Sequence, residues 1–226
     1  MTQQLPYQIS LDTDGFYWTN HHEFYFIQPA PDMFTATETN ESQWGATLTF
    51  KQEDNTWHTQ WLATLHYNDA YIDDTNYRAT SVTGSTSKVI GLSDGYSRKL
   101  SSVVLSAKTR LWDNKLDLVY GGRLDEYSDF GTQNSPRAGI IYYPSPESAI
   151  KYLYGEAFRA PSATDVVGEP PDGTSPVAGG VGPEFITSHE LVFMKQAKSW
   201  KSELVLFKSI WEDGVIIGPG SPPFIA

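Results

Sequence analysis

The stretch from Leu116 to Asp165, which reads LDLVYGGRLDEYSDFGTQNSPRAGIIYYPSPESAIKYLYGEAFRAPSATD, determines the fold class that we expect for this chain. Its apolar residues recur at every second position, whereas an amphipathic helix repeats them at every third or fourth. A polar loop and then a five-residue turn at 144–148 divide the stretch into three alternating segments. The pattern therefore predicts three consecutive β-strands.

Residues 57–68 indicate how long these strands are. At about 3.3 Å per residue, the alternating segment from Trp57 to Tyr67 is about 33 Å long. With a tilt of about 40° it covers about 25 Å of height, the apolar band of an outer-membrane barrel. Strands of soluble sandwiches are usually about five or six residues long. We therefore predict one face toward lipid (Trp57, Trp61, Leu65, Tyr67, Leu116 and Leu118) and the other toward the lumen (His58, His66, Arg123 and Asp125).

Segments of this kind recur along the chain, and the links between them alternate in length. Short polar turns alternate with long links near 69–98, 128–135 and 159–185. An antiparallel meander through a membrane gives this alternation, with short periplasmic turns and long outside loops. The predicted strands lie near 44–51, 56–68, 99–111, 116–127, 136–144, 149–158, 186–195 and 201–213.

Aromatic residues stand beside the short turns, as in the girdle at one membrane interface. They are Phe50, Trp57, Trp112, Tyr143 and Trp200. We therefore predict an all-β fold, an antiparallel up-and-down transmembrane β-barrel segment of about eight strands.

Three motifs, in this order, resemble the barrel domain of TonB-dependent outer-membrane receptors. They are Gly121-Gly-Arg-Leu-Asp125, Pro136-Arg137 and the strand end from Tyr154 to Pro161. The resemblance implies a receptor and transporter in the bacterial outer membrane that takes up a scarce nutrient, and no enzyme. A ferric siderophore is the commonest cargo in that family. The implied partners are outer-membrane lipid, the nutrient complex, and a plug domain and the TonB complex through an N-terminal part.

The resembled receptors have about 22 strands around a plug, and neither a plug nor a signal segment is visible in this sequence. We therefore expect an open fragment of a larger barrel, with edges near 44–51 and 201–213. Turn signals at 12–15 and 29–32 indicate that residues 1–43 are a loop-rich segment, an extracellular loop with a partial strand. Residues 44–226 are expected to supply the barrel strands, periplasmic turns and extracellular loops.

Ionisable residues on these strands are expected to point into the lumen. A charge on the lipid face costs about 2–4 kcal/mol at the bilayer midplane. The predicted lumen-facing structural charges pair across strands or against a plug, and they are Arg123, Asp125, Arg137, Arg159 and Glu190.

Composition excludes several other functions. The chain of 226 residues has no Cys, so it has no disulfide or thiolate metal site, and its net charge of -11 argues against nucleic acid. The neighbours His21 and His22, like Asp125 and Glu126, point to opposite faces of a strand. We therefore expect no catalytic residues, no metal site and no cofactor. Two alternatives stay open: a complete small outer-membrane barrel or adhesin, and a soluble β-sandwich carbohydrate-binding module.

Overall fold

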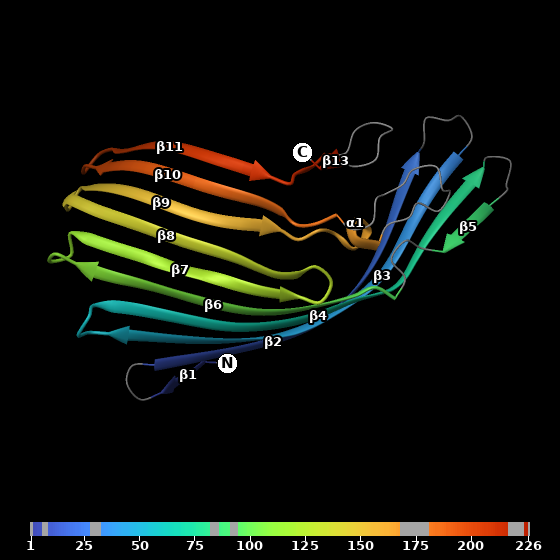
Figure 1. The fold of residues 1–226 in the computed structure, drawn as a ribbon, viewed down its shortest axis with the longest axis horizontal. Coiled ribbons are helices and arrows are strands. Elements are labelled where there is room, and N and C mark those ends of the chain that lie inside the picture. The colour runs from blue at the N-terminus through green and yellow to red at the C-terminus, as the bar shows by residue number, and fades with distance from the viewer. Residues whose placement is uncertain are drawn as a thin grey trace.

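The computed structural model describes residues 2–5, 9–27, 33–81, 86–90, 95–167, 181–216 and 224–225. They form one curved sheet of eleven strands (Figure 1) and a separate two-stranded sheet. The strands of the large sheet are β1 (Thr2–Leu5), β2 (Ile9–Ile27), β3 (Met33–Asp54), β4 (Thr59–Ser81), β5 (Thr86–Ile90), β6 (Ser97–Leu111), β7 (Leu116–Tyr127), β8 (Gly131–Ser145), β9 (Ser148–Arg159), β10 (Glu184–Gln196) and β11 (Lys201–Glu212). The small sheet pairs β12 (Val215–Ile216) with β13 (Phe224–Ile225).

The strands follow one another in chain order, and every pair is antiparallel. The order is β1-β2-β3-β4-β6-β7-β8-β9-β10-β11, with β5 paired to β4 beyond the end of β6. In the described ranges helix is limited to the five-residue α1 (Ala163–Val167), and no helix there is long and apolar enough to cross a membrane. The predicted antiparallel meander is confirmed.

Local chemistry explains two of the tight turns. Before β4, the Asp54 carboxylate accepts hydrogen bonds from the backbone N–H groups of Thr56 (2.8 Å) and Trp57 (3.3 Å). Between β6 and β7, Trp112, Asp113 and Asn114 all adopt positive φ, which Asp and Asn tolerate better than most residues.

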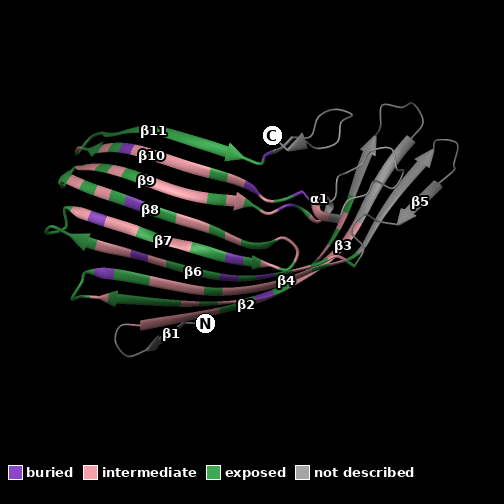
Figure 2. Ribbon diagram, in the orientation of Figure 1, coloured by how far each residue is buried: buried purple, intermediate pink, exposed green. Residues whose placement is uncertain are grey.

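The sheet is a single layer. In the described part of the chain, the buried apolar side chains are Leu100, Ala107, Val181 and Val192 alone, and most of the sheet is exposed or half-buried (Figure 2). Hydrogen bonds between neighbouring backbones therefore hold the strands together, and no second layer of the described chain covers either face of the sheet.

The register separates the side chains onto two faces. Leu48, Leu65, Val103 and Leu124 stand opposite one another across β3, β4, β6 and β7. We call the side that carries this row the apolar face and the other side the polar face. Trp61, Leu65, Tyr67, Leu116 and Leu118 share the apolar face, and His66, Arg123 and Asp125 share the polar face, as predicted. Trp57 and His58, which were predicted to lie on these two faces, belong instead to the turn that precedes β4. Because β4 begins only at Thr59, neither residue is assigned to a face of the sheet.

Several expectations about the first hundred residues were wrong. Residues 1–43 are not loop-rich, because β2 runs from Ile9 to Ile27 and pairs with β3 along its whole length. The expected loop at 69–98 contains the end of β4 and all of β5. The sheet therefore has eleven strands instead of about eight, and residues 44–51 lie inside it, while β1 and β11 form its edges. Pairing with a neighbouring strand has overridden the local turn signals.

The outer part of β2, β3 and β4 bends away from the rest of the sheet (Figure 1). The register of β3 with β4 shifts at this place: Asn40 stands opposite Asp74, whereas Glu41 stands opposite Ile72. Asp73 is the extra residue of this β-bulge. A bulge bends its strand and increases the local twist.

Candidate functional site

The polar face carries the candidate functional residues. Arg137 stands opposite Gly121 and Gly155, and Arg159 stands opposite Glu184. Counting in steps of two along β7 to β10 then places one set of charges on this face: Arg123, Asp125, Arg137, Arg159 and Glu190. That the polar face lines a lumen remains a prediction.

Asp117 on β7 is the centre of the largest cluster. Solvent does not reach its side chain, and its carboxylate pairs with Lys108 Nζ and Arg110 Nε, each at 3.0 Å. Tyr143 donates a further hydrogen bond to it at 3.1 Å. The Tyr143 side chain therefore lies on the polar face and not in the predicted aromatic girdle. Tyr143 lies within the irregularity where the register of β8 with β9 shifts, between Tyr142 and Ser145. Three strands, β6, β7 and β8, are tied together here.

Asp125 is the centre of a second cluster near the other end of β7. Its side chain is almost completely buried, and Arg123 Nε lies 2.6 Å from its carboxylate. Ser102 on β6 donates a hydrogen bond to the same carboxylate oxygen, and Arg123 reaches the Ser102 hydroxyl at 3.3 Å. Two of the predicted charges therefore pair with each other.

The remaining predicted charges differ in their partners. Arg159 forms an ion pair with Glu184, which is buried at the start of β10. Arg137 and Glu190 have no ion-pair partner in the part of the chain that the structure describes. The polar face thus combines closed ion pairs with charges that are available to another surface.

Arg98, at the start of β6, is the centre of a cluster that the sequence did not predict. Its guanidinium pairs with Asp129 (Nη2, 2.6 Å) and donates to the Pro161 carbonyl at 2.8 Å. The rings of Tyr96 and Phe130 lie 5.6 and 5.1 Å from its Cζ, within cation–π range. Burial, followed by the hydrogen bond to Asp129, raises the pKa of Tyr96 to about 12. Arg98 therefore joins β6, the β7–β8 loop and the segment after β9.

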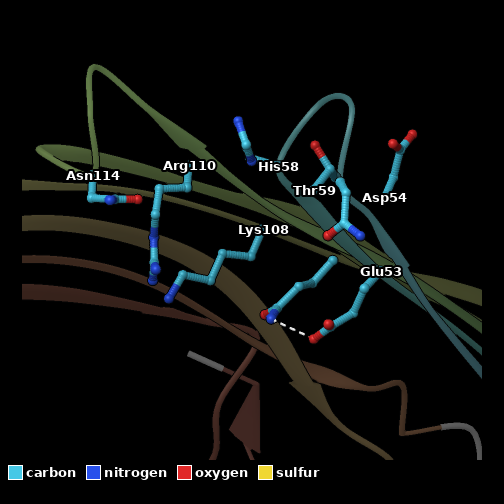
Figure 3. A pocket seen from close by; sticks show the side chains of 9 residues that line it. Glu53, Asp54, His58, Thr59, Lys108, Arg110 and Asn114 are labelled. Carbon is cyan, nitrogen blue, oxygen red and sulfur yellow. Dashed lines mark hydrogen bonds between the residues drawn. The ribbon is translucent and has the colours of Figure 1, made fainter. Parts of the chain in front are cut away.

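A hollow of about 210 Å³ lies beside the short turns (Figure 3). The side chains of Lys108 and Arg110 extend in the same direction, while His58 points away from them. Glu53 accepts a hydrogen bond from the neutral Gln60 amide at 2.9 Å. Two cations share the single Asp117 carboxylate here, and the acidic residues Glu53 and Asp54 also line the hollow, so its side chains do not favour one sign of charge. No group of three His, Asp or Glu that could hold a metal occurs among the described residues.

Long antiparallel strands in a single curved layer, with one exposed apolar face and one ionic face, define the wall of a transmembrane β-barrel. The model of the family "TonB dependent receptor-like, beta-barrel" matches residues 2–208, and the chain belongs to this family. The resemblance given by the sequence motifs is thereby confirmed. No curated protein sequence matches the chain.

Solved receptor structures share this fold. The ferripyoverdine receptor of Pseudomonas aeruginosa, bound to ferripyoverdine, gives a TM-score of 0.64 at 12% identity over 95% of this chain and 32% of its own. The ferric enterobactin receptor of the same organism gives 0.61 at 11% over 92% and 35%. The alcaligin receptor of Bordetella pertussis gives 0.60 at 15% over 97% and 37%. The chain spans about a third of the length of these receptors.

These findings set aside both alternatives. A β-sandwich requires a second sheet packed face to face about 10 Å from the first, whereas the eleven strands of the large sheet form one layer and the other described sheet has two short strands. A complete small barrel would pair its first strand with its last, whereas β1 and β11 are both edges. The prediction of an open fragment of a larger barrel agrees with the structure.

Proposed function

We propose that this chain forms part of the barrel wall of a TonB-dependent receptor in a bacterial outer membrane, and that the receptor takes up a ferric siderophore. The observation that carries the proposal is the division of the sheet into an exposed apolar face and an ion-paired polar face. The family match and the shared fold of siderophore receptors support it. The chain contributes to transport and not to catalysis.

The apolar face is assigned to lipid. Its exposed side chains include Leu65 (44%), Leu105 (58%) and Leu124 (51%), which would be unfavourable in water in a contiguous patch. Aromatic residues border this region on β4, with Trp61 at one end and Tyr71 at the other. The strand from Trp61 to Tyr71 spans about 33 Å, or about 25 Å of height at a tilt of about 40°. This height matches the apolar band of an outer-membrane barrel.

The polar face is assigned to the lumen. Arg123, Asp125, Arg137, Arg159 and Glu190 then act as structural charges of the inner wall. The charges without a partner on the sheet, Arg137 and Glu190, are available to a plug domain supplied by another part of the protein. Contact with the TonB complex would also come through that part.

The direction of the wall follows from its connections. The short turns, with Trp57, Trp112 and Trp200 beside them, are assigned to the periplasmic side. The outer parts of β2, β3 and β4 are assigned to the outside, where a receptor meets its cargo. The outer parts of β2 and β3, from the pair Thr19–Ser42 to the pair Ile27–Phe34, therefore project beyond the membrane wall, and the first part of β2 joins residues 44–216 in that wall.

Measurement of ferric siderophore uptake in cells grown under iron limitation tests the proposal. A strain that lacks the whole gene should lose uptake of one radiolabelled ferric siderophore, and the wild-type gene should restore it. If uptake of every ferric chelate is unchanged while uptake of cobalamin or a glycan is lost, the protein is a transporter but its cargo is not a ferric siderophore. Unchanged uptake of all three classes would contradict the transport function itself.

A further inference from the structure

A hollow of about 650 Å³ lies on the sheet at the place where β2, β3 and β4 leave the apolar region. Its volume falls within the range of small-molecule sites, about 300–1,000 Å³. The side chains that we use in the argument are Tyr17, Thr19, His21, Ser42, Tyr71 and Asp73, and the acidic Glu41 also lines the hollow.

The register shows on which side of the sheet this hollow opens. Thr19 stands opposite Ser42, and Ser42 stands opposite Tyr71. Two residues closer to the turns, the same side carries Trp44, whose ring packs 5.1 Å from that of Tyr67. Six of the nine lining residues lie on this side, whereas Asn20 and Glu41 belong to the other side, so the hollow opens mainly on the apolar face, directly beyond its last aromatic row. Our assignment of this face to lipid is part of the proposed function, and the present inference rests on it.

The β-bulge between β3 and β4 shapes the hollow. Because Asn40 pairs with Asp74 and Glu41 with Ile72, Asp73 has no partner in the ladder. Asp73 lines the hollow together with Tyr71. Bulges re-aim side chains and are over-represented next to functional sites. The shift in register thus adds the acidic residue Asp73 to the hollow. On the side toward the short turns, the same face of the sheet is apolar.

The lining side chains suit a sugar. The rings of Tyr17 and Tyr71 are 71% and 41% exposed, and a tyrosine ring offers an apolar surface with a polar tip. Hydroxyls of Thr19 and Ser42 can both donate and accept, as sugar hydroxyls do. The imidazole of His21 is held by Asn40, with Nδ1 2.7 Å from Oδ1. The lining contains no Lys or Arg, the side chains that bind phosphate best.

We propose that this hollow binds a saccharide unit of an outer-leaflet glycolipid. The side of the sheet decides between the possible sources of sugar, because the apolar face meets the bilayer and not the lumen. The level along the strand agrees, since the hollow begins where the aromatic belt ends and polar headgroups begin. The bound glycolipid would hold the bend of β2, β3 and β4 against the membrane surface.

Binding measurements on the full-length protein in detergent micelles test this inference. The probes are rough lipopolysaccharide (lipid A with its core oligosaccharide), lipid A alone, and the released core oligosaccharide. We expect lipopolysaccharide to bind at least about tenfold more tightly than either part, because both the acyl chains and the sugar contribute. Tyr71→Ala and Thr19→Val should each weaken lipopolysaccharide binding, the former about tenfold. The matched control is Tyr120→Ala, on the same face but level with Trp61 at the opposite border of the apolar band, which should stay within about twofold of wild type.

Three results would overturn the inference. Equal binding of lipid A and lipopolysaccharide would show that sugar is not recognised. Equal binding of released oligosaccharide and lipopolysaccharide would show that the ligand is a soluble sugar. Equal losses in Tyr71→Ala and Tyr120→Ala would show that any aromatic residue on this face suffices. Thr19→Val keeps a β-branched shape on a strand, so it decides the matter if Tyr71→Ala does not fold.

The inference and the proposed function fail separately. Uptake of the ferric siderophore by the Tyr71→Ala protein should stay within about twofold of wild type, because the hollow lies outside the lumen. Normal uptake without any lipopolysaccharide preference contradicts the sugar site alone. Lost uptake only in the gene deletion still supports the transport function.

Discussion

Arg110 and Asp117 stand directly opposite each other on β6 and β7, and Arg110 Nε lies 3.0 Å from a carboxylate that solvent does not reach. Lys108 and Tyr143 complete the coordination of this carboxylate from either side. One acidic side chain thus fixes the relative position of three strands at the end near the short turns. A single layer without a packed core depends on such cross-strand contacts more than a globular domain does.

Removing the charge of Asp117 should therefore destabilise the wall. In Asp117→Asn, Lys108 and Arg110 lose their shared anion, and a buried amide replaces it. Because both cations are partly exposed, we expect a loss of about 1–3 kcal/mol in unfolding free energy instead of the full cost of breaking a buried pair. Urea unfolding of the reconstituted protein measures this loss. Asp14→Asn is the control, since Asp14 is exposed; equal losses in the two variants would contradict the role of Asp117.

Two glycines that stand opposite Arg137 of β8, Gly121 on β7 and Gly155 on β9, should respond differently to a methyl group. A Cβ at Gly121 would lie 2.3 Å from the Leu105 carbonyl oxygen, which is backbone and cannot move aside. We expect Gly121→Ala to cost about 1–3 kcal/mol through this overpacking. At Gly155 no atom lies within 4 Å of the added carbon, so Gly155→Ala should be neutral or slightly stabilising. Urea midpoints measured side by side decide this, and an equal cost at both positions would refute the close approach.

Site-directed spin labels test the assignment of the two faces. The chain has no native Cys, so single cysteines can be labelled without background. Labels at Leu65, Leu105 and Leu124 should be quenched by a lipid-soluble relaxant, and labels at His66 and Arg123 by a water-soluble one. A shift of the register by one residue would exchange the two sets. Similar accessibility for both sets would reject the division on which the proposed function depends.

Tyr96 should titrate later than an ordinary tyrosine. Its pKa is raised to about 12, so the folded protein favours the protonated Tyr96 hydroxyl more strongly than the unfolded chain does. This contribution to stability is complete below about pH 10, the ordinary value, and is lost between about pH 10 and pH 12. Tyrosinate absorbance of wild type minus that of Tyr96→Phe should show a step near pH 12. A step near pH 10 would contradict the burial of this hydroxyl beside Asp129.

Arg98 should control the order of the neighbouring loops. Arg98→Lys keeps the charge but loses the two-nitrogen contact with Asp129 and the geometry that also reaches Pro161. We expect amide hydrogen exchange to accelerate about tenfold in residues 127–131 and 159–162, while the short turns stay unchanged. The control is Arg123→Lys, whose partners lie elsewhere on the wall. Equal acceleration in both variants would point to general loosening.

The sequence could predict the membrane part of the wall because lipid imposes a strict pattern. From β6 to β11 the apolar residues repeat with period two and short turns alternate with longer links, so both the strands and their faces follow from the residues. The ion pair of Arg123 with Asp125 agrees with the same argument, since two residues apart on a strand means one face.

The same reasoning failed where lipid makes no demand. The outer parts of β2 to β5 are rich in Thr, Asn and Asp, so they carry no alternating apolar signal, and their strands form because a neighbouring strand completes the ladder. The Arg98 cluster was also missed, because its partners Asp129 and Pro161 lie 31 and 63 residues away along the chain. Residues so far apart along the chain come into contact only after the register of three hairpins is set.

The chain-order pairing of the strands also bears on how such walls can change in evolution. Because each hairpin bonds only to the hairpins beside it in sequence, duplicating or deleting one does not reroute the remaining chain. The circumference of the wall can therefore grow or shrink by two strands at a time, while the existing ladders keep their partners. Copying or losing one hairpin-coding segment of the gene would therefore change the width of the wall without a new fold.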